Sequence, residues 1–372
     1  MAGVGQGDAW GIIRPNKGYG RKKDKVARVI VRVTVELKRV VFEPEALNYP
    51  LGRKLYQRFH EERVEVLMTP SHNRVTCIPG KTARESFLEA KRTLVVGVRR
   101  SRDFQTCKPS AHYQLPLVTS CPAMCEYCYL FTHFGRKPYQ RIYVNIAEIL
   151  ALARDYINRR DPEVTYFEAS ATSDPLPVEK YTGSLAAAIE FMARQPLGRL
   201  RVATKFTDVD GLLNLDHRGH TRFRFSINAE NIIKRFEHGT PPLGQRLAAA
   251  AQMAGGGYLT GFIIAPIFYL EGWQQQYRHL FQVIARQPLL AESNDLTLEL
   301  ITHRFTKRAK TSIETLFPNT KLPLDEEERT FRYGQFGYGK YVYPAEVRTA
   351  IEAFFKEMVA TYLPRAKVEY FI

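Results

Sequence analysis

Hydrophobic and polar residues recur with two different periods along this chain, and the change of period indicates how the chain is organised. From Ala27 to Leu37 apolar residues alternate with mostly polar ones, which predicts a strand. Residues 40–115 mix short apolar runs with one helical stretch near Ala83–Arg92. From residue 116 to about 320, short apolar runs alternate with segments of helical period. This second region therefore predicts a regular succession of strands and helices.

Six strand–helix units are predicted between residues 115 and 320. Their strands are mostly apolar throughout, as strands buried on both faces are. Strict alternation of strand and helix predicts parallel strands with right-handed crossovers. Six units favour an α/β fold of the partial TIM barrel type, (β/α)6, and an open α/β sheet is the alternative. The predicted strands are Leu115–Val118, Val164–Glu168, Leu200–Phe206, Arg222–Ile227, Leu259–Phe268 and Leu296–Ile301, and the helices are Ile146–Asn158, Ser184–Arg194, a short one near Gly211, Gly244–Ala254, Trp273–Arg286 and Lys307–Leu316.

The end of the chain has a different pattern. Arg332–Tyr341 is aromatic, basic and interrupted by glycines, which predicts a β-hairpin. A helix over Ala345–Tyr362 and a strand over Val368–Ile372 follow, and we expect that strand to complete a sheet edge. We therefore divide the chain into a basic N-terminal extension (1–39), a mixed α/β region (40–115), the partial barrel (116–320) and a C-terminal hairpin, helix and strand (321–372).

Three cysteines in one short loop are the strongest chemical signal. Cys121, Cys125 and Cys128 have the spacing C-x3-C-x2-C, which fits three corners of a cubane iron–sulfur cluster. The fourth iron then has no protein ligand and can bind a small molecule. A zinc site with a distant fourth ligand, or three buried free thiols, are the alternatives. Zinc usually takes two Cys or Cys/His pairs, and the sequence has no second pair.

Further polar residues are predicted just where core strands end. Parallel α/β folds gather their chemistry at the carboxyl ends of their strands. The residues expected there are Cys121, Ser170–Asp174, Lys205, Ser226, Asn228, His303 and Arg304.

The charge of the chain indicates a polyanionic partner. Lys and Arg number 54 against 38 Asp and Glu, which gives a net charge of +16. Such an excess favours nucleic acid, with an anionic membrane surface as the alternative. No apolar run approaches the length of a membrane span, and the first ten residues do not form a secretory signal. Three of the five cysteines share one loop, which argues against a disulfide framework and indicates the cytoplasm.

Several blocks of residues together resemble the spore photoproduct lyase family, radical S-adenosylmethionine (AdoMet) enzymes that repair ultraviolet-damaged DNA. The resemblance covers about residues 40–372. The blocks are Phe42–Leu47, Ser71–Asn73, Lys108–Ala111, Cys121–Leu130, Thr221–Asn228 and His303–Lys307.

The resemblance implies a cofactor site and a reaction. Cys121, Cys125 and Cys128 would hold a [4Fe–4S] cluster. AdoMet would bind near Tyr127, Tyr129, Ser173, Lys205 and Ser226, and would yield a 5′-deoxyadenosyl radical. That radical would abstract hydrogen from the lesion, whose bridge then breaks to restore two thymines. The family also implies a one-electron reductant of flavodoxin or ferredoxin type, a location in the spore core, and a monomer.

The lesion must leave the base stack to meet a radical held inside a barrel. The C-terminal hairpin is the expected wedge, with Lys340 on a phosphate and Phe336 or Tyr338 against exposed bases. Arg304, Lys307 and Lys310 are expected phosphate contacts, with ordinary solvated charge as the alternative. At the hairpin tip the family typically has Arg-Tyr where this chain has Gln335-Phe336.

A second departure concerns the hydrogen donor. The family usually has a cysteine directly after Phe167–Ser170, where this chain has Ala171, and a methyl group cannot donate that hydrogen. Either Ala171 is an engineered change, or another residue donates, or the substrate differs. Cys77 is the favoured donor because it lies in a family-like block where the family commonly has glycine; its alternative role is a small buried hydrophobe. Cys107, Tyr127 and Tyr129 are further candidates.

Two other functions stay open at this point. The chain could be a diverged radical AdoMet enzyme that acts on another nucleic-acid lesion or modified base. It could also bind damaged DNA without turnover, although the retained cysteines, Lys205 and Ser226 argue against that.

Overall fold

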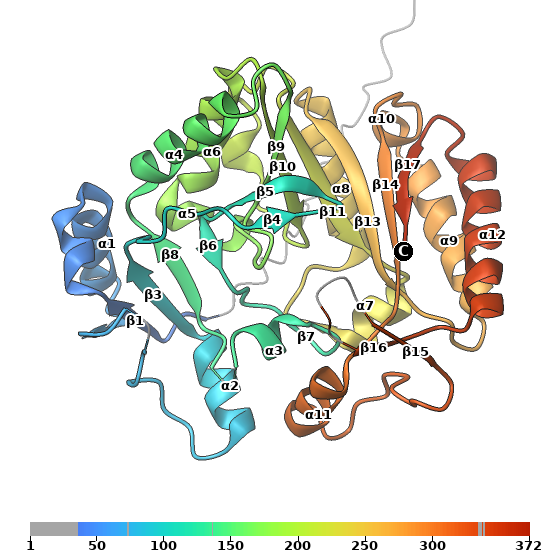
Figure 1. Ribbon diagram of the computed structural model, residues 1–372, viewed down its shortest axis with the longest axis horizontal. Coiled ribbons are helices and arrows are strands. Elements are labelled where there is room, and N and C mark those ends of the chain that lie inside the picture. The colour runs from blue at the N-terminus through green and yellow to red at the C-terminus, as the bar shows by residue number, and fades with distance from the viewer. Residues whose placement is uncertain (1–35, 73, 136, 334–336, 338) are drawn as a thin grey trace, which may run out of the picture. The chain divides into compact units, whose positions relative to one another are not determined.

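A single curled sheet dominates the structure, a computed structural model that describes residues 36–372 apart from 73, 136, 334–336 and 338 (Figure 1). Among these residues the sheet has eight strands in the order β17-β14-β13-β11-β10-β9-β5-β4. All neighbours are parallel except β4 and β5, which form an antiparallel hairpin. The strands are β4 (Thr106–Cys107), β5 (Ala111–Leu115), β9 (Thr165–Ala169), β10 (Gly198–Thr204), β11 (Thr221–Ile227), β13 (Leu259–Ile267), β14 (Thr297–Thr302) and β17 (Lys367–Phe371).

Helices cover the outer face of this sheet (Figure 1). Alternate residues such as Phe167, Val202 and Phe225 are fully buried under the helices. Residues of the opposite parity include Glu168 and Arg224, which line the inside of the curled sheet. The covering helices are α4 (Ile146–Asn158), α6 (Ser184–Ala193), α8 (Leu243–Gly255), α9 (Trp273–Ala285) and α12 (Ala345–Tyr362). The predicted strand–helix units are therefore present, with a 3-10 turn, η2 (Asp210–Leu212), as the short helix near Gly211.

A second sheet is built from both sides of the cysteine loop. Its order among the described residues is β2-β1-β3-β8-β6, with β6 antiparallel to β8 and the other neighbours parallel. It is flanked by α1 (Pro50–Glu61) and α2 (Ala83–Lys91). The strands are β1 (Arg39–Phe42), β2 (Glu65–Met68), β3 (Thr93–Gly97), β6 (Val118–Thr119) and β8 (Gln140–Tyr143). The cysteine loop therefore lies on the connection from β6 to β8, two strands of this second sheet.

The prediction of one strand over Leu115–Val118 was wrong. The chain leaves the large sheet after Leu115 and enters the second sheet at Val118. Pro116 has no N–H for a continuing ladder. The next two N–H groups, of Leu117 and Val118, donate to Ser170 Oγ at 3.1 and 3.0 Å instead. The strand expected over Ala27–Leu37 falls mostly outside the described residues, and the first described strand begins at Arg39.

The C-terminal elements match their predictions. β15 (Thr330–Tyr333) and β16 (Gly339–Val342) pair antiparallel, α12 has the predicted bounds, and β17 lies at the edge of the large sheet. A bridge between Phe305 and Tyr341 ties this hairpin to the loop that enters α11 (Lys307–Leu316). In the described part of the chain, no helix is long and apolar enough to cross a membrane.

Candidate active site

The carboxyl ends of the central strands bring together several residues predicted from the sequence. Lys205 Nζ, after β10, donates to Ser226 Oγ, near the end of β11, at 2.5 Å. Asp174, after β9, accepts from Thr204 Oγ1 at 2.8 Å and from the Lys205 main-chain N–H at 2.8 Å. Burial raises the pKa of Asp174 to about 6. These bonds fix the relative position of three neighbouring strand ends.

The backbone of the cysteine loop is held by protein contacts along its length. Ser120, in the left-handed region at φ 62°, donates from its N–H to Thr172 O at 3.1 Å and from Oγ to Pro138 O at 2.7 Å. Ser173 Oγ donates in turn to the Ser120 carbonyl. Further on, β7 (Met124–Cys125) pairs antiparallel with β12 (Glu237–His238). The loop is thus anchored beside the strand ends.

Two lysines lie near the three thiols. Lys91, almost fully buried on α2, donates from Nζ to the Cys121 carbonyl at 2.6 Å. Burial raises the pKa of Cys121 to about 12 and that of Cys125 well above its usual value. The Lys91 charge opposes this rise at Cys121, and the Lys205 charge opposes it at Cys125. Thiols in such a setting ionise when they bind a cation.

The thiols fit a cluster better than a single ion. Among the described residues, no three His, Cys, Asp or Glu side chains converge on a point that could hold one metal ion, as tetrahedral zinc requires. A cubane places each thiolate on a different iron, so its cysteines need not converge. Backbone N–H groups also point at the sulfurs, from Ala123 to Cys121 and from Leu130 to Cys128. Such donors and nearby cations stabilise an anionic iron–sulfur group.

Tyr127 belongs to a buried ion network behind the strand ends. Its hydroxyl donates to Glu237, whose other oxygen lies 2.6 Å from Arg246 Nη2. Lys205 Nζ lies 3.8 Å from Glu237 and 5.9 Å from the centre of the Tyr127 ring. Burial raises the pKa of Glu237, but the charges of Lys205 and Arg246 lower it more, so that it lies below its usual value. Lys91, Glu237 and Arg246 were not predicted from the sequence; a charged residue on an otherwise apolar helix face is the signal that could have found Lys91 and Arg246.

Tyr129 lies on the open side of the loop, with 61% of its surface exposed. Its hydroxyl donates to the Ala171 carbonyl at 3.4 Å. The Cys107 thiol is within electrostatic reach of this tyrosine. Burial raises the pKa of Cys107 to about 12, and the Glu168 carboxylate adds to the rise. Cys107 therefore stays a protonated thiol close to Tyr129.

The two candidate donor cysteines lie in different surroundings. Cys107 ends β4, and the turn after it is tied to the inside of the large sheet by Ser110. Ser110 Oγ donates to Glu168 at 2.6 Å and accepts from Arg224 Nη1 at 2.9 Å. Cys77 instead packs against a small hydrophobic cluster of the second sheet, which includes Val41 and Val75.

The predicted DNA-contact residues are brought together in part. Arg304 is exposed directly after β14, and its charge lowers the pKa of Lys340 after the larger effect of burial, so the two cations are close. Lys307 is exposed in the first turn of α11, and Lys310 Nζ lies 3.3 Å from Glu326 Oε1. Gln335, Phe336 and Tyr338 lie outside the described residues.

Comparison with known proteins identifies the family. The sequence model of spore photoproduct lyase matches residues 36–372, almost the whole chain. The chain belongs to the spore photoproduct lyase family. Spore photoproduct lyase of Clostridium acetobutylicum is 47% identical over 335 residues, which cover 90% of this chain and 98% of that protein. The enzyme of Bacillus subtilis is 48% identical over 332 residues, 89% of this chain and 97% of that protein.

Solved structures of spore photoproduct lyase share the fold. One is a variant with a cysteine replaced by alanine and a serine replaced by cysteine, with bound AdoMet and dinucleoside spore photoproduct. It matches with a TM-score of 0.89 at 50% identity, over 92% of this chain and all of that one. Another, complexed with dinucleoside spore photoproduct, matches with a TM-score of 0.88 at 50% identity, over 90% of this chain and 98% of that one. The family resemblance, the partial barrel and the lyase class expected from the sequence are confirmed.

Proposed function

We propose that this lyase repairs DNA by converting spore photoproduct, 5-thyminyl-5,6-dihydrothymine, into two thymines, and that it does so with a [4Fe–4S] cluster and AdoMet. One observation carries the proposal. In a member of this family, the three-cysteine loop lies at the carboxyl ends of parallel strands, beside Lys205 and Ser226. A similar structure holds both AdoMet and the dinucleoside lesion, which supports the same ligands here.

Cys121, Cys125 and Cys128 would hold the cluster, and Tyr127, Tyr129, Ser173, Lys205 and Ser226 would surround AdoMet. When bound together, the two cofactors supply a 5′-deoxyadenosyl radical inside the barrel. A one-electron donor of flavodoxin or ferredoxin type would serve as reductant.

The chain's own residues would orient these groups. The Lys205–Ser226 bond and the Glu237–Arg246 pair hold their polar atoms in fixed directions before any ligand arrives. Preorganised polar groups bind without the cost of rearrangement.

The DNA would bind across the hairpin side of the barrel. Arg304 and Lys340 carry positive charge next to one another, which suits two oxygens of the DNA backbone. Lys307 adds a further cation at the start of α11, while Lys310 is already paired with Glu326. Gln335, Phe336 and Tyr338 are proposed to contact the bases beside the flipped lesion.

Cys107 is better supported as hydrogen donor than Cys77, which the sequence analysis favoured. Its thiol is near Tyr129, and Tyr129 reaches the loop of Ala171, where the family usually has the donor cysteine. Cys77 packs in the cluster of the second sheet. The combination of Ala171 with a cysteine elsewhere also parallels the similar structure in which one cysteine is replaced by alanine and a serine by cysteine.

Donation from Cys107 would complete the repair. The S–H bond breaks, a C–H bond forms on the thymine allyl radical, and a thiyl radical remains on sulfur. Tyr129 can return a hydrogen atom to that sulfur from its hydroxyl. This leaves a radical on the Tyr129 oxygen, which would recover a hydrogen atom from 5′-deoxyadenosine, the molecule that carries the hydrogen taken from the lesion, so the hydrogen atoms balance.

The test is an anaerobic assay with reconstituted protein, AdoMet, dithionite and an oligonucleotide that carries one spore photoproduct. Chromatography measures restored thymine and 5′-deoxyadenosine. Clean recovery of thymine is expected. Formation of 5′-deoxyadenosine with an undamaged lesion would overturn the proposed substrate, and a protein that binds no iron after reconstitution would overturn the proposed cofactor.

A further inference from the structure

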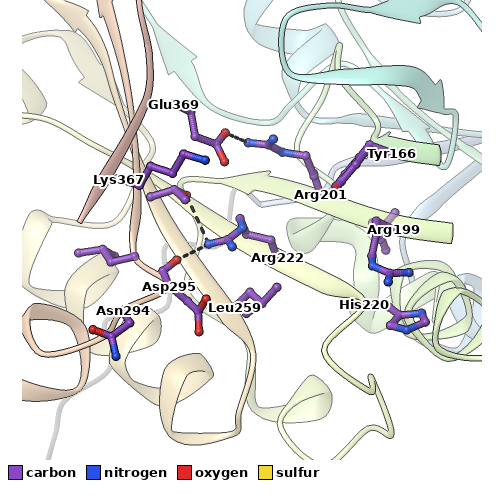
Figure 2. Close-up of a pocket in the computed structure, with 13 residues that line it drawn as sticks. Tyr166, Arg199, Arg201, His220, Arg222, Leu259, Asn294, Asp295, Lys367 and Glu369 are labelled. Carbon is purple, nitrogen blue, oxygen red and sulfur yellow. Dashed lines mark hydrogen bonds and ion pairs between the residues drawn. The ribbon is translucent and has the colours of Figure 1, made fainter. Parts of the chain in front are cut away.

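A cavity of about 380 Å³ opens at the amino ends of the parallel strands, opposite the end that carries Lys205 and Ser226 (Figure 2). We call it the base pocket, because it lies at the base of the barrel. Its lining includes Tyr166 on β9, Arg199 on β10, Arg222 on β11, Leu259 on β13, Asp295 before β14 and Lys367 on β17. Each of these residues is the first or second residue of its strand, or comes shortly before the strand begins. The cavity is thus a feature of the barrel that the proposed reaction does not use.

Three cations of the base pocket lack a carboxylate partner. Arg199, Arg222 and Lys367 form no ion pair within the described part of the chain. Arg201, by contrast, is neutralised by Glu299 at 2.6 Å and by Glu369. The remaining acidic side chain of the lining, Asp295, is exposed at the rim. The pocket therefore holds an excess of positive charge in a partly enclosed space.

Main-chain bonds fix the central arginine. Arg222 Nη1 donates to Thr260 O at 2.8 Å and to Asp295 O at 2.5 Å. Figure 2 shows the bond to Asp295 at the Arg222 guanidinium, which lies between Lys367 and Asp295. Among the described residues, the buried Arg201 Nε also has no hydrogen-bond partner. An arginine fixed on one side by carbonyl oxygens presents its other donors to a ligand.

The other walls suit the organic part of a molecule. Leu259 and Leu296 supply apolar surface, and the Tyr166 ring is 41% exposed. His220 donates from Nδ1 to Met192 O at 2.8 Å, so its Nε2 is left as an acceptor. Cavities that combine apolar walls with a few fixed polar groups are typical of small-molecule sites.

We propose that the base pocket binds the phosphate group of a nucleotide-sized small molecule. Arg222 and Lys367 would contact the phosphate oxygens, and Tyr166 with the two leucines would contact a planar or apolar remainder. Arginine forks match phosphate geometry, and a fixed guanidinium without a carboxylate partner gains most from such a ligand. The proposal rests on the base pocket alone and is independent of the proposed repair reaction.

The test is equilibrium dialysis of the full-length, reconstituted protein against radiolabelled thymidine 5′-monophosphate, with thymidine and inorganic phosphate as competitors. The exposed Lys367→Gln variant is expected to weaken nucleotide binding about fivefold, and Arg222→Gln about tenfold or more. Lys54→Gln, which removes one charge from the exposed face of α1, is the matched control and should leave binding unchanged. Circular dichroism confirms that each variant is folded, and Lys367→Gln keeps the test decisive if Arg222→Gln is not.

The two competitors and a parallel titration with an oligonucleotide distinguish a small phosphorylated molecule from a nucleic-acid backbone as the ligand. Inorganic phosphate should compete with the nucleotide, and thymidine should not. If thymidine competes as well as phosphate, or if Lys367→Gln binds the nucleotide as the parent does, the proposal is overturned. An undamaged oligonucleotide is titrated in parallel. If the variants weaken binding of the oligonucleotide and not of the mononucleotide, the site belongs to a nucleic-acid backbone and the small-molecule assignment is wrong.

Discussion

The two ends of the barrel use charge in opposite ways. At the carboxyl ends of the strands, Lys205 is bonded to Ser226 and Arg246 is paired with Glu237. At the amino ends, Arg222 and Lys367 have no carboxylate partner in the described part of the chain. Between the two ends, Arg224 bridges Glu168 and Glu299 inside the curled sheet.

This difference indicates at which end a bound ligand adds most to stability. Charges that are already paired within the protein are oriented for chemistry, and they change little when a ligand binds. Arg222 has no carboxylate partner and is partly buried, which lowers its pKa, so a ligand of opposite sign stabilises its charge. The carboxyl end is therefore prepared to position groups, and the amino end to hold an anion.

The largest expected effect separates the two ends completely. Cys125→Ala should abolish cluster binding, because two thiolates cannot replace three. Iron content after reconstitution and formation of 5′-deoxyadenosine should fall to background, whereas binding of thymidine 5′-monophosphate at the base pocket should be unchanged. Cys77→Ala is the matched control and should load iron normally. Full iron loading of Cys125→Ala would refute its assignment as a ligand.

A change in the middle of the barrel should lower the stability of the whole fold and so affect both ends. Arg224→Met leaves Glu168 and Glu299 buried without their shared cation, which should lower the free energy of unfolding by about 3–5 kcal/mol. Chemical denaturation measures the change. Arg218→Met, which breaks an exposed pair with Asp216, is the control and should cost about 0–1 kcal/mol. Equal costs for the two variants would show that the buried network does not hold the barrel together.

The hydrogen donor should affect only the carboxyl end. Cys107→Ala should reduce clean thymine recovery by roughly tenfold or more, because the product radical would lose its proposed hydrogen donor. Cys77→Ala should keep the parent yield. Repair in deuterated water adds a second readout, since an exchangeable thiol places deuterium in the restored thymine methyl group. Loss of that label in Cys77→Ala, with Cys107→Ala unaffected, would reverse the assignment.

The smallest effect concerns the amino end and pH. His112 Nδ1 accepts the main-chain N–H of Tyr166 at 3.0 Å, so the neutral ring is needed. Burial, and then the charge of Arg160, hold the pKa of His112 below its usual value. The unfolded chain therefore binds this proton more readily, and stability should fall by about 1 kcal/mol as pH drops from about 7 to 5.

Thermal or urea unfolding at several pH values measures this loss. His112→Gln should remove most of the pH dependence, whereas His60→Gln, on the exposed face of α1, should keep it. A parent protein whose stability is flat between those pH values would contradict the prediction.

Much of the barrel could be predicted because its elements carry local signals. The apolar period of Ala345–Tyr362 gave α12 at its observed bounds, and the apolar run from Leu259 gave β13 within one residue. Strand ends followed from the same pattern, so Lys205 and Ser226 could be placed together before the structure was known.

Contacts between distant segments could not be predicted in this way. Lys91 reaches Cys121 from a helix of the second sheet, and Tyr127 meets Glu237 across more than a hundred residues. The preference for Cys77 rested on its local block, whereas the position of Cys107 depends on how the β4–β5 turn is tied to Glu168 and Arg224. Such pairings depend on tertiary packing, which cannot be read from the local pattern of a single sequence.

The pairing of β7 with β12 has a consequence for how the enzyme endures exposure to air. Cys125 is part of that pair, and Ser120 is bonded to Thr172 and Pro138, so protein contacts alone shape the loop. In small zinc domains the metal creates the fold, and its loss unfolds the chain. Here oxidative loss of the proposed cluster would leave the cysteine loop folded. The protein would then regain activity on reloading with iron and sulfide, without new synthesis.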